Sequence, residues 1–85
     1  MKIVFHKKFT KQFDKLPKKI QEQFYEKLVI FEIDPFNSSL KNHLIHYPYD
    51  ECRSINITGD IRALYETIDD ITLFIRVGSH SELYK

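Results

Sequence analysis

Three stretches near the C-terminus constrain the fold of this 85-residue chain more than any other feature. In residues 51–57, 60–67 and 71–77, odd and even positions form two sets of side chains that differ in character. This two-residue period is typical of a β-strand whose two faces differ. Only Thr58–Gly59 and residues 68–70, which include Asp69–Asp70, separate the three stretches. Connections this short join antiparallel neighbours. The sequence therefore predicts three consecutive antiparallel strands.

The N-terminal half predicts one short strand and two helices. Residues 2–5 are β-branched or aromatic apart from Lys2, as in a strand. An apolar stripe with helical spacing follows, and Pro17 ends that helix and starts another, from about Pro17 to Ile33. The first stripe consists of Phe9, Phe13 and Leu16. The second consists of Ile20, Phe24, Leu28 and Phe31, widened by Tyr25, Val29 and Ile33.

The predicted fold class is α+β, with the order β-α-α-β-β-β. We expect a mainly antiparallel sheet of four strands, with the two-helix hairpin covering one face. The opposite face would be open, polar and concave. Residues 35–50 contain turn signals and are predicted to be a connection without secondary structure of its own. In residues 71–77 strict alternation places Arg76 with Phe74 and apart from Val77.

Length and composition favour one domain, residues 1–85. Hydrophobic residues make up 42% of the chain, which is enough for a compact core. The one cysteine, Cys52, cannot form an internal disulfide and suits a reducing compartment. No apolar run approaches the ~20 residues of a membrane span. We therefore expect a soluble cytoplasmic protein.

Charge is distributed unevenly along the chain. Residues 1–27 contain eight lysines and three acidic residues, a net charge of +5, whereas residues 28–85 carry −4. A lysine-rich half can bind a phosphate backbone, because neutralising phosphates releases counterions. Lysines also commonly line the solvated faces of helices. The pattern alone leaves both interpretations open.

Three segments carry a family resemblance. Residues 41–43 read Lys-Asn-His, residues 52–65 contain Cys-Arg-Ser-Ile followed by Asp-x-Arg-x-Leu-Tyr, and residues 78–84 read Gly-Ser-His-Ser-Glu-Leu-Tyr. Together they resemble the RelE/ParE superfamily of type II toxins, closest to its YafQ-like mRNA interferase branch, over essentially the whole chain. The resemblance implies a RelE-like fold and an endoribonuclease that cuts mRNA in the ribosomal A site. It also implies a cognate antitoxin from the same operon as partner.

The resemblance also suggests site residues. His43, Asp60, His80 and Tyr84 match positions that YafQ-like toxins use for catalysis or substrate contact. Asn56 stands where those toxins often have another histidine, so it can orient a ribose or phosphate but cannot carry a proton. This departure keeps open the alternative of a catalytically decayed toxin that still binds its antitoxin.

Metal-free RNA cleavage requires a base for the ribose 2′-OH, an acid for the departing 5′-oxygen, and a donor that stabilises charge on phosphorus. Histidine suits either proton-transfer role, since its unperturbed pKa lies near neutrality. His80 follows the last strand and is the predicted acid, with a base role left open. His43 is the second candidate, and Asp60 either orients a histidine or acts as base. An aspartate after Thr58–Gly59 is also what a hairpin turn favours.

Two arginines and one tyrosine complete the predicted site. The guanidinium of Arg62 or Arg53 can hold the scissile phosphate through paired hydrogen bonds, and alternation favours Arg62 because the two arginines fall on different faces. Tyr84 can stack on a base or close the end of the core. We expect no metal and no cofactor, because the His and Cys spacings do not suit zinc. A ParE-like gyrase poison remains the functional alternative.

Overall fold

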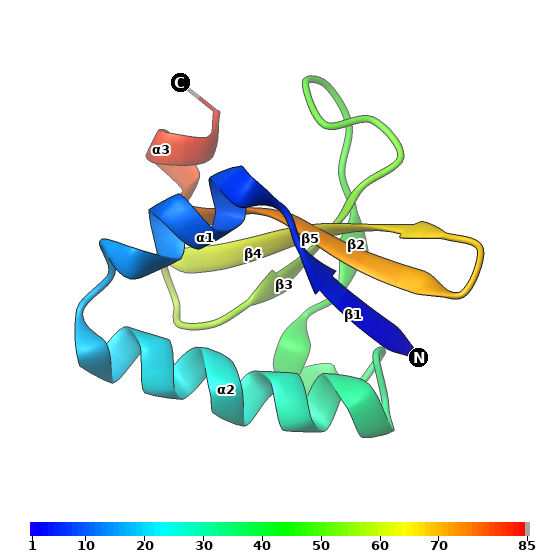
Figure 1. The fold of residues 1–85 in the computed structure, drawn as a ribbon, viewed down its shortest axis with the longest axis horizontal. Coiled ribbons are helices and arrows are strands. Elements are labelled where there is room, and N and C mark those ends of the chain that lie inside the picture. The colour runs from blue at the N-terminus through cyan, green and yellow to red at the C-terminus, as the bar shows by residue number, and fades with distance from the viewer. Residues whose placement is uncertain (85) are drawn as a thin grey trace.

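The computed structural model describes residues 1–84 (Figure 1). The strands are β1 (Lys2–Phe5), β2 (His43–Leu44), β3 (Arg53–Asn56), β4 (Ile61–Ile68) and β5 (Ile71–Ser79). The helices are α1 (Lys7–Asp14), α2 (Lys18–Ile33), the 3₁₀ turn η1 (Ser38–Leu40) and α3 (His80–Leu83). The predicted order of strands and long helices is confirmed.

One five-stranded sheet has the order β1-β5-β4-β3-β2. β1 runs parallel to β5, and the other pairs are antiparallel. The four predicted strands are present, and β2 adds a fifth by pairing with β3. The prediction that residues 35–50 lack secondary structure was wrong. The side chain of Asn37 accepts a hydrogen bond from the Ser39 N–H and so starts η1. The backbone of β2 pairs with β3 in the sheet.

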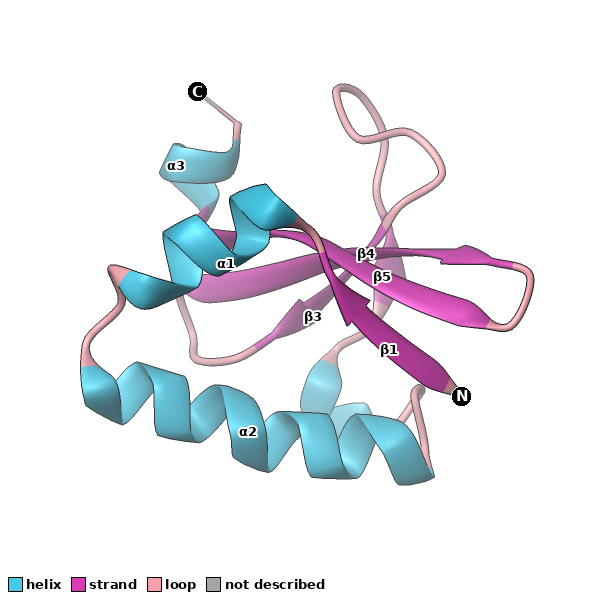
Figure 2. Cartoon of the chain, viewed as in Figure 1, coloured by secondary structure: helices cyan, strands magenta, loops and turns pink. Residues whose placement is uncertain are grey.

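The main core lies between the sheet and the α1–α2 pair (Figure 2). Phe74, in β5, is fully buried at its centre, with its ring 5.6–5.8 Å from four neighbouring phenylalanine rings and 5.5 Å from Tyr65. Both helical stripes reach this core through Phe9, Phe24 and Phe31. The expectation that the helix pair covers one face is therefore confirmed.

The wider stripe predicted for α2 is not buried. Tyr25, Val29 and Ile33 are 55%, 59% and 81% exposed. They lie four residues apart along α2, so they share one side of the helix. A helix this size covers its face of the small sheet with the narrower stripe alone. We call these three residues the apolar stripe.

A β-bulge changes which face of the sheet the side chains of β5 occupy. Tyr65 pairs with Phe74, whereas Leu64 pairs with Arg76, so β5 has one extra residue at this point. Phe74 and Val77 both enter the main core. Strict alternation predicted them on opposite faces, which was wrong. Arg76 is consequently turned to the face away from α1 and α2.

The face away from α1 and α2 is only partly open. A second apolar cluster of Ile45, Cys52, Leu64 and Leu83 covers its middle. Its members come from the loop after β2, from β4 and from α3. The prediction of a wholly polar face was wrong here, because the loop and α3 bring apolar side chains onto it. Polar side chains remain beside this cluster, where Ser54 and Arg76 flank Leu64, and at the end of the sheet beyond it.

Within residues 1–84, the structure has no helix that combines the length and the apolar character needed to cross a membrane.

Candidate active site at the end of the sheet

Two unpartnered polar atoms mark the end of the sheet on the face away from α1 and α2. Asn56 in β3 and Arg62 in β4 are direct cross-strand partners. The Oδ1 atom of Asn56 and the Nε atom of Arg62 are buried, yet neither has a hydrogen-bond partner in the described residues. Such atoms are rare in folded proteins, because burial removes the hydrogen bonds that water would provide. One is an acceptor and the other a donor, and both side chains are half-exposed. A ligand with a hydroxyl and an anionic oxygen would satisfy both atoms once the side chains turn to expose them.

Helix α3 holds His80 beside this pair. Arg62 pairs with Gly78, and Ile61 pairs with Ser79, so His80 directly follows the ladder. The Ser79 hydroxyl accepts from the Glu82 N–H at 3.2 Å, and the Glu82 carboxylate accepts from the Ser79 N–H at 2.8 Å. This reciprocal cap fixes where the strand ends and the helix begins. His80 is exposed, and its ring lies 4.7 Å from the Tyr84 ring.

Tyr84 is half-buried and forms a second ring contact, with Tyr49 at 5.9 Å. The Tyr49 hydroxyl donates to the Leu83 carbonyl at 3.0 Å. These contacts attach α3 to the loop after β2. Tyr84 thus lies against the His80 ring, with part of its surface free to meet a base.

Asp60 lies in the turn between β3 and β4, at the same end of the sheet. The Thr58 hydroxyl oxygen accepts hydrogen bonds from the N–H groups of Asp60 and Ile61 at 3.2 and 3.0 Å. The turn geometry therefore depends on Thr58, and the exposed Asp60 carboxylate is left for other contacts. Because Ile61 pairs with Ser79, Asp60 and His80 belong to neighbouring chain segments.

His43 approaches the same face from the other edge. It pairs with Ser54, two residues before Asn56, and its Nδ1 lies 2.8 Å from the Lys41 carbonyl oxygen. β2 and β5 are three strand spacings apart, about 14 Å in backbone separation. The structure therefore does not bring His43 and His80 into contact. It places them on opposite sides of the Asn56 and Arg62 pair.

Arg53 does not join this group. Its guanidinium lies 5.1 Å from the centre of the Phe36 ring, and its Nε donates to the Asn42 side-chain oxygen at 2.8 Å. Asn42 in turn donates to the Tyr65 hydroxyl at 2.7 Å. Arg53 lies on the helix side of the sheet, as alternation predicted, and there it ties the segment before β2 to the core.

Arg76 is a candidate that sequence reasoning missed. The bulge places it on the same face as Arg62, opposite Leu64 and two residues before Gly78. The site face thus carries two guanidiniums, Arg62 at its end and Arg76 further along β5. Nothing in the alternating pattern reveals the extra residue in β5, so no sequence signal indicated that Arg76 faces this way.

Cys52 is not equipped as a nucleophile. Burial raises the pKa of its thiol above the ordinary value, and the carboxylates of Glu66 and Glu51 raise this pKa further, against a smaller lowering by Arg76. A thiol with a raised pKa stays protonated and unreactive near neutral pH. Among residues 1–84, no three His, Cys, Asp or Glu side chains are gathered as the ligands of a metal ion would be.

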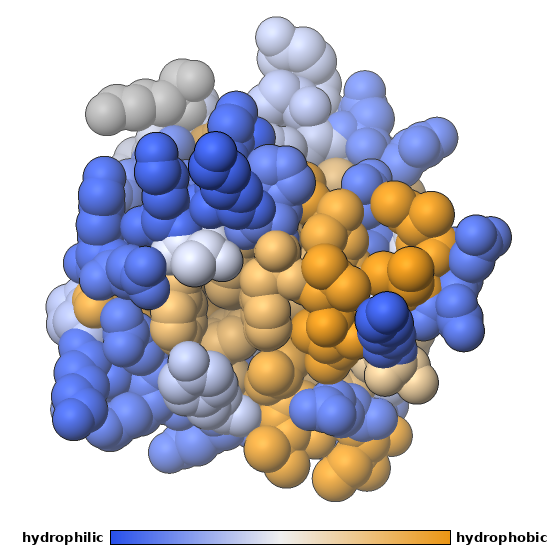
Figure 3. Space-filling view, in the orientation of Figure 1, coloured by the Kyte–Doolittle hydropathy of each residue, from blue (hydrophilic) through white to orange (hydrophobic). Residues whose placement is uncertain are grey.

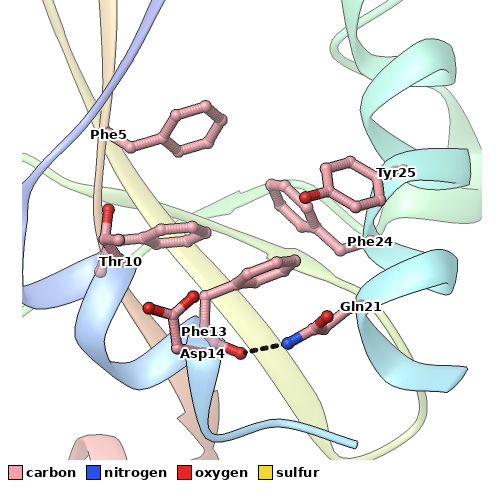
Figure 4. Close-up of a pocket in the computed structure, with 8 residues that line it drawn as sticks. Phe5, Thr10, Phe13, Asp14, Gln21, Phe24 and Tyr25 are labelled. Carbon is pink, nitrogen blue, oxygen red and sulfur yellow. Dashed lines mark hydrogen bonds between the residues drawn. The ribbon is translucent and has the colours of Figure 1, made fainter. Parts of the chain in front are cut away.

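An apolar groove lies on the other side of the molecule, between β1, α1 and α2 (Figure 4). Its volume is about 280 Å³, and Phe5, Phe13, Phe24 and Tyr25 are among the rings on its wall. Gln21 closes one end by donating to the Phe13 carbonyl at 3.0 Å. In the space-filling view, hydrophobic atoms extend from this area over β1 and the C-terminal half of α2, while hydrophilic atoms gather over α1 (Figure 3).

Comparison with known families gives one match over nearly the whole chain. The family described as ParE toxin of type II toxin-antitoxin system, parDE, matches residues 3–84. Comparison with curated protein sequences gives no match.

Solved structures share the fold. YafQ from E. coli strain BL21(DE3) has a TM-score of 0.83 at 17% identity, covering 98% of this chain and 97% of that chain. A copper-bound mutant toxin from Helicobacter pylori has a TM-score of 0.74 at 25% identity, covering 98% of each chain. The E. coli DinJ-YafQ complex gives a TM-score of 0.73 at 19% identity, covering 98% of this chain and 97% of that chain. The family match confirms the resemblance to the RelE/ParE superfamily, and the likeness to YafQ shows that the fold is shared.

Proposed function

This chain belongs to the ParE toxin family of type II toxin-antitoxin systems, and on that premise we propose that it is a ribosome-dependent mRNA endonuclease that needs no metal ion. The observation that carries the proposal is the unpartnered Asn56 and Arg62 pair next to the exposed His80. A ribose hydroxyl would satisfy the Asn56 oxygen, and a phosphate oxygen would satisfy Arg62. RNA provides both groups at every linkage.

The proposed reaction runs through the ribose 2′-OH. A base removes its proton, and the 2′-oxygen attacks phosphorus to give a 2′,3′-cyclic phosphate. The 5′-oxygen leaves and takes a proton from the acid. Attacking and leaving oxygens lie roughly in line across phosphorus, so acid and base belong on opposite sides of the scissile phosphate. His80 as acid and His43 as base meet this requirement from opposite sides of the Asn56 and Arg62 pair, whereas Asp60, next to His80, suits the alternative role of orienting that histidine.

In this proposal, arginines stabilise the negative charge that develops around phosphorus. Arg62 faces the scissile phosphate in this proposal, and Arg76 reinforces it from β5. Guanidinium hydrogen bonds to an anionic oxygen are about twice as strong as bonds between neutral groups. Asn56 orients the ribose but carries no proton, which leaves two histidines and Asp60 as the titrating groups.

The wild-type protein is predicted to leave a specific kind of RNA end. Added to a translating extract, it should produce messages that end in 2′,3′-cyclic or 3′-phosphates within the region covered by the ribosome. The chemistry of the RNA ends is measured by mapping 3′-ends before and after two treatments, one that opens cyclic phosphates and one that removes phosphates. Ends bearing a free 3′-hydroxyl, or equal cleavage of ribosome-free RNA, would contradict the proposal.

The family match itself favours a second candidate, a ParE-like gyrase poison. Such a toxin needs no acid and base pair. Induced expression would then trigger DNA-damage signalling while messages remain intact. A decayed toxin would produce neither response but would retain the partner described next.

The proposed partner is the antitoxin encoded in the same operon, bound at the apolar groove and the adjoining apolar stripe. The stripe residues are more than half exposed, although apolar surface of this extent favours burial. β1 is an edge strand next to the groove and offers unpaired backbone groups. The lysines concentrated in residues 1–27 favour an acidic segment.

Substitution Val29→Asp tests this surface. Val29 is 59% exposed in the middle of the apolar stripe, so a carboxylate there should leave the fold intact and weaken antitoxin binding by at least about tenfold, as loss of an interface anchor does. Titration calorimetry with the purified antitoxin measures the effect. The matched control is Tyr47→Asp, at an exposed apolar residue in the loop after β2, and it should bind normally. Equal affinity of both variants for the antitoxin would mean that the antitoxin binds another surface.

A further inference from the structure

A polar cavity of about 240 Å³ adjoins the candidate active site at the free edge of β3. Lys27 from α2 and Lys41 after η1 lie on one side, and the turn after β3 closes the other. β2 pairs only with the first half of β3, so this edge is uncovered at Asn56. The complete lining is Lys27, Ser39, Lys41, Asn56, Ile57, Thr58 and Gly59.

The cavity carries positive charge without a counter-charge. Lys27 is half-buried, and its ammonium makes one long hydrogen bond, 3.4 Å, to the Ser39 carbonyl. No acidic side chain lines the cavity. A partly buried lysine usually has an acidic partner or extends its ammonium into solvent. Two lysines that line one cavity without an acidic partner there therefore favour an anion in it.

The cavity and the candidate active site share one residue. Asn56 lines the cavity and also pairs with Arg62 across the sheet. Its Oδ1 atom is buried and has no hydrogen-bond partner in the described residues. An RNA strand whose scissile phosphate lies at Arg62 therefore has a neighbouring phosphate within reach of the lysines.

We propose that this cavity binds a backbone phosphate of the RNA next to the phosphate that is cut. The inference rests on the function proposed above and adds a subsite to it. Lys27 and Lys41 neutralise the phosphate, and the Thr58 hydroxyl and the turn backbone lie on the opposite wall. Holding this second phosphate fixes which linkage of the message is presented to His80.

Binding is tested first without any reaction. A short 2′-O-methyl RNA oligomer, which cannot be cut, is titrated into isotope-labelled protein, and the amide signals of Thr58 and Gly59 are followed by NMR. We expect these signals to shift and the Lys27→Gln/Lys41→Gln double variant to bind at least about tenfold more weakly. Loss of one phosphate contact should also reduce the slope of the logarithm of the binding constant against the logarithm of the salt concentration by about 0.7 in magnitude. The matched control, Lys18→Gln/Lys19→Gln, removes two exposed lysines outside the cavity and should bind as the wild type does.

Activity provides the second arm. In a ribosome-dependent assay, the Lys27→Gln/Lys41→Gln variant should raise the half-saturating substrate concentration about tenfold and spread cleavage over neighbouring linkages of the message. A wild type without any cleavage would refute the proposed endonuclease, while the NMR arm would still decide whether the cavity binds phosphate. Unshifted Thr58 and Gly59 signals, or equal binding by both double variants, would overturn the subsite. A response to inorganic phosphate but not to RNA would also overturn it, because the cavity would then be a free-anion site.

Discussion

His80→Ala should reduce mRNA cleavage by about 10²–10⁴-fold, because general acid catalysis contributes that much to a rate. His80 is exposed at the start of α3, and its ring contacts only Tyr84 among the described aromatic groups. Removal of the imidazole should therefore leave the fold and the antitoxin affinity unchanged. Single-turnover cleavage on programmed ribosomes measures the rate, and induced expression in cells should lose its toxicity.

A matched histidine separates the chemical role of His80 from a general effect. His46 is also exposed, but it lies in the loop after β2 and outside the site. His46→Ala should cleave like the wild type. If His80→Ala kept the wild-type rate and produced the same RNA ends, His80 would not be the acid. If both variants lost activity equally, the effect would be on folding or expression.

The long-range outline of the fold could be predicted from residue patterns. The second helix was expected at about 17–33, and α2 spans Lys18–Ile33. The three alternating stretches became β3, β4 and β5. These elements are long enough for their periods to appear in the sequence, and Pro17 and Pro35 mark the two ends of α2 through backbone geometry.

Short and irregular features could not be predicted in this way. β2 has two residues, too few to display any period, and it forms only because the edge of β3 is available. The bulge in β5 depends on how β4 and β5 fit together, so Arg76 was assigned to the wrong face. The second cluster joins Ile45, Cys52 and Leu83 across distant parts of the chain.

The candidate site shows the same division. His80 and Asp60 are predicted from the family resemblance and Arg62 from guanidinium chemistry, and their closeness follows from the β4 to β5 register. The unpartnered atoms of Asn56 and Arg62 were not foreseeable, since hydrogen-bond partners depend on three-dimensional packing. The lysine cavity was equally hidden, because Lys27 and Lys41 belong to separate elements.

Phe74→Ala should cost about 3–5 kcal/mol of the free energy of unfolding, the usual loss for a large buried ring. Phe74 is fully buried in β5, and its ring meets those of Phe5, Phe9, Phe24, Phe31 and Tyr65. A domain of this size has only about 5–15 kcal/mol in total. The variant should therefore melt at least about 12 °C lower, since 1 kcal/mol corresponds to roughly 4–8 °C in a domain of 60–100 residues.

The reason for so large an effect is the position of Phe74 between layers. From the middle of the sheet its ring contacts both helices, and its neighbours come from β1, α1, α2 and β4. Truncation leaves a cavity that these rings cannot fill without separating a helix from the sheet. Ile33→Ala is the matched control, since Ile33 is 81% exposed and should change stability by no more than about 0.5 kcal/mol. Thermal and urea unfolding followed by circular dichroism measures both, and a Phe74→Ala loss as small as the control's would mean that the aromatic cluster does not join the two layers.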